Sequence, residues 1–206
     1  ASPSATGTVS ASPSVTASAS ASPSATGTVS AAGTAKGALT DDFSAGAAKW
    51  TTLTGTWEVA DGVYRQTDAS GYDFITQFTG EVPAACTVTV KIRPAGDKLG
   101  AGLLLGQPRP GTRSGATLVD VTDGSYLRWG AYSSGGTYQF TGGNALPGKA
   151  VKGQWHVLRV EVSPSRTVLF WDDRNVGEIK PIGKGRVGLV TSVSAVDFDD
   201  FSVTPA

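Results

Sequence analysis

The stretch Cys86-Thr-Val-Thr-Val-Lys-Ile-Arg93 alternates apolar and polar residues along its whole length. Successive side chains of a β-strand point to opposite faces of the sheet. The alternation therefore places the valines and Ile92 on one face, and the threonines, Lys91 and Arg93 on the other. A strand of this kind buries one face against a hydrophobic core.

Two later runs extend this pattern. The strand expected at Trp155–Val162 carries leucine and valines on one face, and Arg159 and Glu161 on the other. The run Thr167-Val-Leu-Phe-Trp171 is apolar on both faces. It predicts a central strand, or a strand whose second face lines a groove.

Short runs of this type recur through the second part of the chain, separated by turn signals such as Asp61-Gly62, Pro110-Gly111 and Asp123-Gly124. No stretch of ten residues or more has the 3.6-residue apolar period of a helix. The pattern predicts an all-β fold, a two-sheet antiparallel sandwich or a barrel. The expected strands are Thr56–Ala60, Val63–Thr67, Tyr72–Phe78, Cys86–Arg93, Gly102–Gly106, Ala116–Val121, Tyr126–Tyr132, Thr137–Phe140, Trp155–Val162, Thr167–Trp171, Val187–Thr191 and Val196–Val203.

The composition divides the 206 residues into a linker over 1–39 and a folded part over 40–206. Residues 1–39 consist almost entirely of small and polar residues, and the decamer at 1–10 recurs unchanged at 21–30. Such a segment has too little apolar surface to fold, so we expect a disordered spacer. Tracts rich in Ser, Thr and Pro are typical of extracellular stalks, either plain or O-glycosylated. They suggest a secreted or cell-surface protein with another domain or an anchor upstream.

Charge and cysteine content exclude several classes of function. The net charge is zero, which gives no basic footprint for nucleic acid or anionic membranes. No run approaches the apolar length of a membrane helix, so no membrane insertion is expected here. The single cysteine, Cys86, allows no internal disulfide and no zinc site, and its apolar surroundings predict a buried thiol.

A series of motifs resembles one large superfamily of β-sandwiches. The motifs are Leu39-Thr-Asp-Asp-Phe43, Gly55-Thr-Trp57, Gly153-Gln-Trp155, Gly185-Arg-Val-Gly-Leu-Val190 and Phe198-Asp-Asp-Phe-Ser-Val203. Their order is similar to that of concanavalin A-like lectins and glucanases, and more narrowly to laminin G-like jelly-roll modules of bacterial secreted proteins. The resemblance implies that the first and last strands pair, and that Trp57 and Trp155 are core and turn anchors. This fold carries enzymes, lectins and adhesion domains alike.

Catalytic residues are not evident. Glycoside hydrolysis needs two carboxylates across a cleft, and glucanases of the resembled superfamily carry them closely spaced on one strand. None of the four glutamates here has an acidic residue at that spacing. The single histidine, His156, lies within an alternating strand, which predicts a hydrogen-bonded structural role. We therefore expect a protein that is not an enzyme.

A calcium ion is the expected cofactor. If the terminal strands pair, the acidic pairs Asp41-Asp42 and Asp199-Asp200 converge, and a bound Ca²⁺ would relieve their repulsion. The resemblance also implies a structural calcium near these strands, with Asp42 and Asp200 as the ligands. The alternative is that these aspartates face solvent or pair with lysine and arginine.

The segment from Asp120 to Tyr138 is the best candidate for sugar binding. Alternation places Tyr126, Arg128 and Tyr132 on one face, with Leu127 and Trp129 on the other. An outward row of aromatic and planar polar side chains suits sugar stacking and hydroxyl recognition. Cross-strand aromatic pairing that stabilises the sheet is the alternative. The predicted ligand-binding residues are Asp120, Tyr126, Arg128, Tyr132 and Tyr138.

These observations predict a non-catalytic carbohydrate-binding module that recognises a polysaccharide or another glycan. Two alternatives stay open: an extracellular sensor or adhesion domain of a membrane-anchored protein with a protein ligand, and a glycan-active enzyme with an unfamiliar site.

Overall fold

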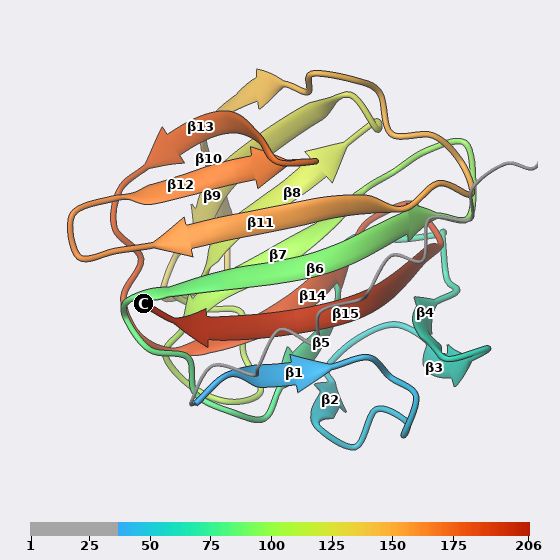
Figure 1. Ribbon diagram of the computed structural model, residues 1–206, viewed down its shortest axis with the longest axis horizontal. Helices are drawn as coiled ribbons and strands as arrows, with labels where there is room; N and C mark the ends of the chain where they lie inside the picture. Colours follow the sequence, from blue (N-terminus) through green and yellow to red (C-terminus); the bar gives the residue numbers. More distant parts are fainter. Residues whose placement is uncertain (1–36) are drawn as a thin grey trace, which may run out of the picture. The chain divides into compact units, whose positions relative to one another are not determined.

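The computed structural model describes residues 37–206 (Figure 1). Of the linker predicted over 1–39, residues 1–36 lie outside the described residues. The first strand begins at Leu39, one residue before the predicted start of the folded part. No helix with the length and apolar character needed to cross a bilayer occurs in residues 37–206.

The regular structure of the described residues consists entirely of β-strands. They are β1 (Leu39–Asp41), β2 (Trp50–Thr52), β3 (Trp57–Ala60), β4 (Val63–Gln66), β5 (Phe74–Phe78), β6 (Cys86–Pro94), β7 (Ala101–Gln107), β8 (Thr117–Thr122), β9 (Tyr126–Tyr132), β10 (Tyr138–Ala145), β11 (His156–Val162), β12 (Thr167–Trp171), β13 (Arg174–Ile179), β14 (Arg186–Thr191) and β15 (Val196–Pro205).

The strands form two antiparallel sheets that pack face to face. Sheet A has eight strands in the order β13-β12-β11-β6-β15-β4-β3, with β1 also paired to β15. Sheet B has seven strands in the order β10-β9-β8-β7-β14-β5-β2. Sheet A lies in front of sheet B in Figure 1. The predicted all-β, two-sheet antiparallel sandwich is therefore confirmed.

The alternating strands lie at the middle of sheet A. Val88, Val90 and Ile92 of β6 have no exposed surface and face the core between the sheets. In the register with β11, Val90 lies opposite Leu158 and Val88 opposite Val160. The predicted faces of these two strands are correct, because burying one apolar row from each strand removes the largest area from water.

The first and last strands pair, as the resemblance implied. In this pair Asp41 lies opposite Phe201. Aromatic rings gather beneath the pair: the ring centroids of Trp50 and Phe201 are 4.9 Å apart, and those of Phe43 and Tyr64 are 5.1 Å apart. This cluster closes one end of the core.

The two tryptophans expected as anchors have different environments. Trp57 packs against the core beside Tyr64 and Phe198. Trp155 lies outside the core, and the guanidinium of Arg93 is 4.4 Å from the centre of its ring. Trp155 is thus half-buried outside the core, directly after the turn that precedes β11, where it stacks with a cation.

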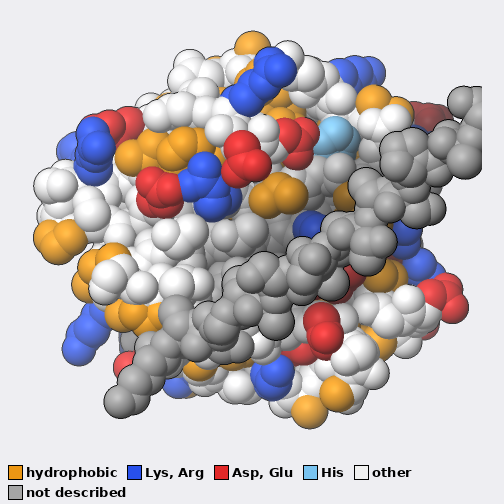
Figure 2. Space-filling view, in the orientation of Figure 1, with side chains coloured by type: hydrophobic (Ala, Val, Ile, Leu, Met, Phe, Trp, Pro, Cys, Tyr) orange, Lys and Arg blue, Asp and Glu red, His pale blue; other side chains and the backbone are white. Residues whose placement is uncertain are grey.

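The outer face of sheet A mixes acidic and basic side chains (Figure 2). Here Arg159 pairs with Glu161 and lies 3.7 Å from the ring centre of Phe170. This contact explains the run that is apolar on both faces: β12 is an interior strand, and the arginine covers its second face.

A smaller apolar cluster lies on the outer face of sheet B. Its buried members are Ile75, Leu104, Ala116, Leu118, Tyr132 and Val190. The β7–β8 connection is tied to this sheet, since the Gly111 N–H donates to Gln77 Oε1 at 3.0 Å and Gln107 Nε2 donates to the Thr112 carbonyl at 3.0 Å. The outer face of sheet B is thus covered near β5 and β14, and more open near β9 and β10.

Candidate functional site

Strand β9 supplies the predicted sugar-binding residues. Leu127 and Trp129 pack on the core between the sheets, whereas Tyr132 belongs to the cluster on the outer face of sheet B. Tyr126 and Arg128 share the face of Tyr132 by alternation. The structure therefore brings these three side chains to one face, as the sequence pattern predicted.

Asp120 and Arg128 form a cross-strand ion pair on this face. They lie opposite each other on β8 and β9, and Arg128 donates from Nε to Oδ1 at 2.8 Å and from Nη2 to Oδ2 at 3.0 Å. Gly102 makes room for the carboxylate, since a Cβ there would lie 2.8 Å from the Asp120 Cβ. Burial raises the pKa of Asp120 to about 6, because desolvation of the carboxylate outweighs the attraction of Arg128.

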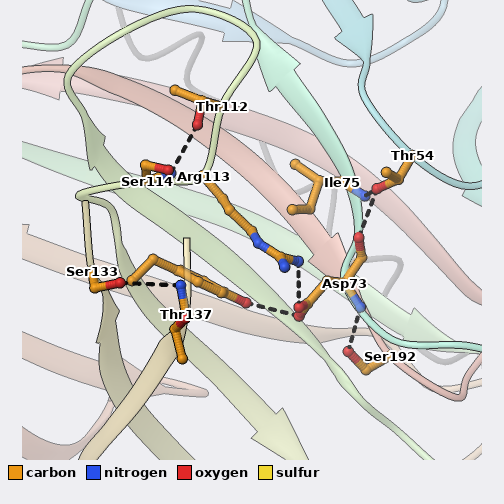
Figure 3. A network of polar contacts seen from close by, with 10 residues as sticks. Thr54, Asp73, Ile75, Thr112, Arg113, Ser114, Ser133, Thr137 and Ser192 are labelled. Carbon is orange, nitrogen blue, oxygen red and sulfur yellow. Dashed lines mark hydrogen bonds and ion pairs between the residues drawn. The ribbon is translucent and has the colours of Figure 1, made fainter. Parts of the chain in front are cut away.

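A second acid–base pair anchors Tyr132. The Tyr132 hydroxyl donates to Asp73 Oδ1 at 2.8 Å. Arg113 Nη1 donates to Asp73 Oδ2 at 2.6 Å (Figure 3). The Arg113 guanidinium lies 5.0 Å from the centre of the Tyr132 ring. Tyr132 is 2 % exposed, so its ring cannot serve as a stacking platform. Burial and the neighbouring Asp73 both raise the pKa of the phenol, which stays protonated.

Asp73 was not anticipated from the sequence. It has a left-handed backbone, with φ of 57°, and its N–H donates to Ser192 Oγ at 3.1 Å. The Thr54 hydroxyl donates to its carbonyl at 2.6 Å (Figure 3). The turn signal Gly71-Tyr-Asp73 was available in the sequence, since aspartate tolerates this conformation. Its partners on β9 and in the β7–β8 connection are set by the tertiary fold.

Three aromatic side chains share the outer face of sheet B with Arg128. The Arg128 guanidinium is 5.4 Å from the centre of the Tyr138 ring. Tyr138 lies over Gly130, where a Cβ would come within 2.6 Å of its ring, and Tyr126 lies over Gly143. Phe140 stands two residues beyond Tyr138 on the edge strand and is 60 % exposed.

We call Tyr126, Arg128, Tyr138 and Phe140 the β9–β10 face. Phe140 was missed as a site residue, although its alternation with Tyr138 was readable in the sequence. The sequence did not show that β10 is an edge strand, and this position leaves Phe140 exposed to solvent.

The chemistry of this region favours binding. Both oxygens of Asp120 accept hydrogen bonds from Arg128, and both oxygens of Asp73 are occupied by Tyr132 and Arg113. A general acid or base needs an oxygen that can reach the substrate. The paired charges cancel, so the face offers aromatic surface and fixed donors with no excess charge.

The remaining chemically reactive side chains have structural partners. His156 Nδ1 lies 2.8 Å from Asp172 Oδ2, and its Nε2 accepts the Val151 N–H at 3.2 Å. The ring stacks on Trp171, which confirms the expected structural role. Cys86 is buried, as predicted, and its thiol donates to the Pro83 carbonyl at 3.4 Å.

The two predicted calcium ligands, Asp42 and Asp200, line one hollow beside β1 and β15. Each carboxylate already has a partner: Asp42 accepts from the Ser44 N–H and hydroxyl, and Asp200 pairs with Lys91 at 2.5 Å. No group of three or more metal-ligating side chains occurs within residues 37–206. A cation here would need water or backbone oxygens at most of its positions. Calcium binding stays a prediction.

Comparisons with known proteins identify the fold. No family model matches the chain, and no curated protein matches it. Among solved structures it is similar to carbohydrate-binding module CBM66 from Bacillus subtilis, with a TM-score of 0.64 and 16% identity over 74% of this chain and 93% of that one.

Two further solved structures are similar. A protein of unknown function with a galectin-like fold from Bacillus subtilis has a TM-score of 0.65 and 12% identity, over 81% of this chain and 94% of that one. A putative glycosyl hydrolase from Parabacteroides distasonis has a TM-score of 0.56 and 12% identity, over 81% of this chain and 90% of that one. The predicted fold is confirmed, and the narrower laminin G-like assignment stays a prediction: the chain has a galectin-like, concanavalin A-like β-sandwich fold.

Proposed function

We propose that residues 40–206 form a non-catalytic carbohydrate-binding module that recognises a neutral glycan on the β9–β10 face. The observation that carries the proposal is the exposed aromatic surface of Tyr126 and Phe140 on the same face as Arg128, whose guanidinium is held by two hydrogen bonds to Asp120. Aromatic rings pack against the apolar faces of sugars, and a fixed guanidinium donates to hydroxyls. The balanced charges favour an uncharged ligand.

Similarity to carbohydrate-binding module CBM66 supports this function. The occupied oxygens of Asp120 and Asp73 support a binding role over a hydrolytic one. The Ser/Thr/Pro-rich composition of residues 1–39 supports a secreted or cell-surface location, with this segment as a tether to another domain or anchor.

The test is retention of the full chain on a panel of neutral insoluble and gel-embedded polysaccharides. We expect Tyr126→Ala and Phe140→Ala each to weaken binding about 10-fold, the effect of losing one stacking contact of about 1.4 kcal/mol. Trp155→Ala is the matched control, because this tryptophan lies on the surface of sheet A. Tyr132→Ala is unsuitable, since its buried ring would leave a cavity.

Two results would count against the proposal. Retention that survives both substitutions on the β9–β10 face would move the glycan site elsewhere. Absence of retention on every polysaccharide would favour the sensor or adhesion alternative, with a protein ligand.

A further inference from the structure

A hollow of about 780 Å³ opens between the two sheets, where the edge strands β10 and β13 approach each other. Its lining comes from β8, β9 and β10 on one side and from the β11–β12 turn and the end of β13 on the other. The volume lies in the range of pockets that bury a small organic ligand. Tyr126, Arg128, Tyr138 and Phe140, which form the β9–β10 face, do not line it.

The hollow exists because the two edges are joined at one end only. Asn144 Nδ2 donates to the Val176 carbonyl at 2.7 Å and links β10 to β13. Beyond this link, Thr141 and Ile179 line the opening from opposite edges. A single side-chain hydrogen bond between two sheet edges leaves the rest of the gap accessible from solvent.

The indole of Trp129 lies within the gap. A Cβ at Gly142 would come 2.7 Å from its Nε1, and a Cβ at Gly177 would come 3.0 Å from its Cη2. The two glycines therefore hold the ring between the sheets, where it lines the hollow. Trp129 is half-buried, and within residues 37–206 its indole N–H donates to no acceptor, so this donor is open to a ligand. The hollow thus offers a flat apolar wall with an available donor.

The rim of the hollow carries excess positive charge. Arg166 Nη1 and Glu178 Oε2 are 3.2 Å apart and neutralise each other. Lys180, which also lines the hollow, makes no ion pair within residues 37–206. An unpaired ammonium beside an aromatic wall suits a ligand that combines a ring with a carboxylate.

We propose that this hollow is a second binding site, which takes a hexuronate unit: its ring packs on Trp129 and its carboxylate pairs with Lys180. Thr117, which also lines the hollow, adds a hydroxyl that can hydrogen-bond to the sugar ring. This site is separate from the β9–β10 face and does not depend on the function proposed there.

The direct test is titration of the ¹⁵N-labelled full chain with glucuronate and galacturonate, and with glucose and galactose as neutral controls. Trp129→Phe assigns the Trp129 indole N–H signal. We expect the two uronates to shift this signal with saturation, and the neutral sugars to leave it in place at equal concentration. An indole signal that does not move with either uronate, or that moves equally with the neutral sugars, would overturn the proposal.

The role of the Lys180 charge is tested with Lys180→Gln against the control Lys184→Gln, which changes an exposed lysine that does not line the hollow. We expect Lys180→Gln to weaken uronate binding about 10-fold, as loss of a charged hydrogen bond does. The control should bind like the unmodified protein. Equal affinities of the two variants would overturn the assignment of Lys180.

The two proposed binding sites can be tested independently of each other. Tyr126→Ala and Phe140→Ala should leave uronate binding unchanged, and Lys180→Gln should leave retention on neutral polysaccharides unchanged. Loss of uronate binding in the Tyr126→Ala variant would overturn the second site, because it would place the uronate on the β9–β10 face.

Discussion

The Asp120 carboxylate lies directly opposite Arg128 on the neighbouring strand and accepts two hydrogen bonds from it, at 2.8 and 3.0 Å. This pair fixes the guanidinium at 5.4 Å from the centre of the Tyr138 ring. The arrangement gives the β9–β10 face its one fixed cation. It also buries the Asp120 carboxylate, whose protonation affects the stability of the fold.

The stability of the protein should depend on the protonation of Asp120. The pKa of this group is about 6 in the fold against 3.8 ordinarily, so between these values the folded state holds a proton that the unfolded chain has lost. Its contribution to stability is therefore greatest at low pH and declines as pH rises towards 6. We expect the unfolding free energy of the wild type, relative to Asp120→Asn, to fall by on the order of 2 kcal/mol from pH 4.5 to 7.

Urea unfolding of both proteins at the two pH values checks this prediction. The comparison with Asp120→Asn is necessary because other carboxylates, such as Asp42 and Asp68, have lowered pKa values and act in the opposite direction. A free-energy difference that is the same at both pH values would contradict it.

The hydroxyl of Tyr132 should matter for stability although it is remote from solvent. Tyr132→Phe keeps the ring beneath Arg113 but removes the hydrogen bond to Asp73. We expect a loss of about 1.5–3 kcal/mol in unfolding free energy, as for hydrogen bonds to charged groups. Tyr126→Phe is the control, since that ring is partly exposed, and should change stability little. Equal losses of unfolding free energy in the two variants would contradict a stabilising hydrogen bond between Tyr132 and Asp73.

The thiol of Cys86 should be inert in the native protein. Burial raises its pKa to about 11, so at pH 8 it is protonated and only 2 % exposed. We expect an aromatic disulfide reagent to leave the folded protein unmodified and to react with one thiol after unfolding in urea. Rapid native-state reaction would show that β6 opens locally.

Calcium is tested by thermal unfolding with added Ca²⁺ and with a chelator. If Asp42 and Asp200 bind the ion, Ca²⁺ raises the midpoint by mass action, and the rise is absent from the Asp42→Asn, Asp200→Asn double variant. Lys91→Gln should enlarge the rise, because this lysine competes for Asp200. Identical unfolding midpoints with calcium and with chelator would contradict calcium binding.

The sequence predicted some features of the site and missed others for a physical reason. Alternation placed Tyr126, Arg128 and Tyr132 on one face, because strand geometry alone sets that property. It could not show that Tyr132 is buried, since Arg113 and Asp73 arrive from distant connections. Strand β13 was not among the expected strands, because an edge strand with mostly exposed residues carries little apolar alternation.

The sequence by itself therefore determined the all-β class, the faces of the central strands, and the structural roles of His156 and Cys86, whereas the pairing of the first and last strands was implied by the resemblance. These features follow from the local alternation of apolar and polar residues, which a strand needs in order to bury one face in the hydrophobic core. Only the tertiary structure decided which face residues remain exposed, which carboxylates are occupied by arginine, and that β10 and β13 separate to leave a hollow beside Trp129. These properties depend on contacts between residues far apart in the chain, and no local pattern specifies them.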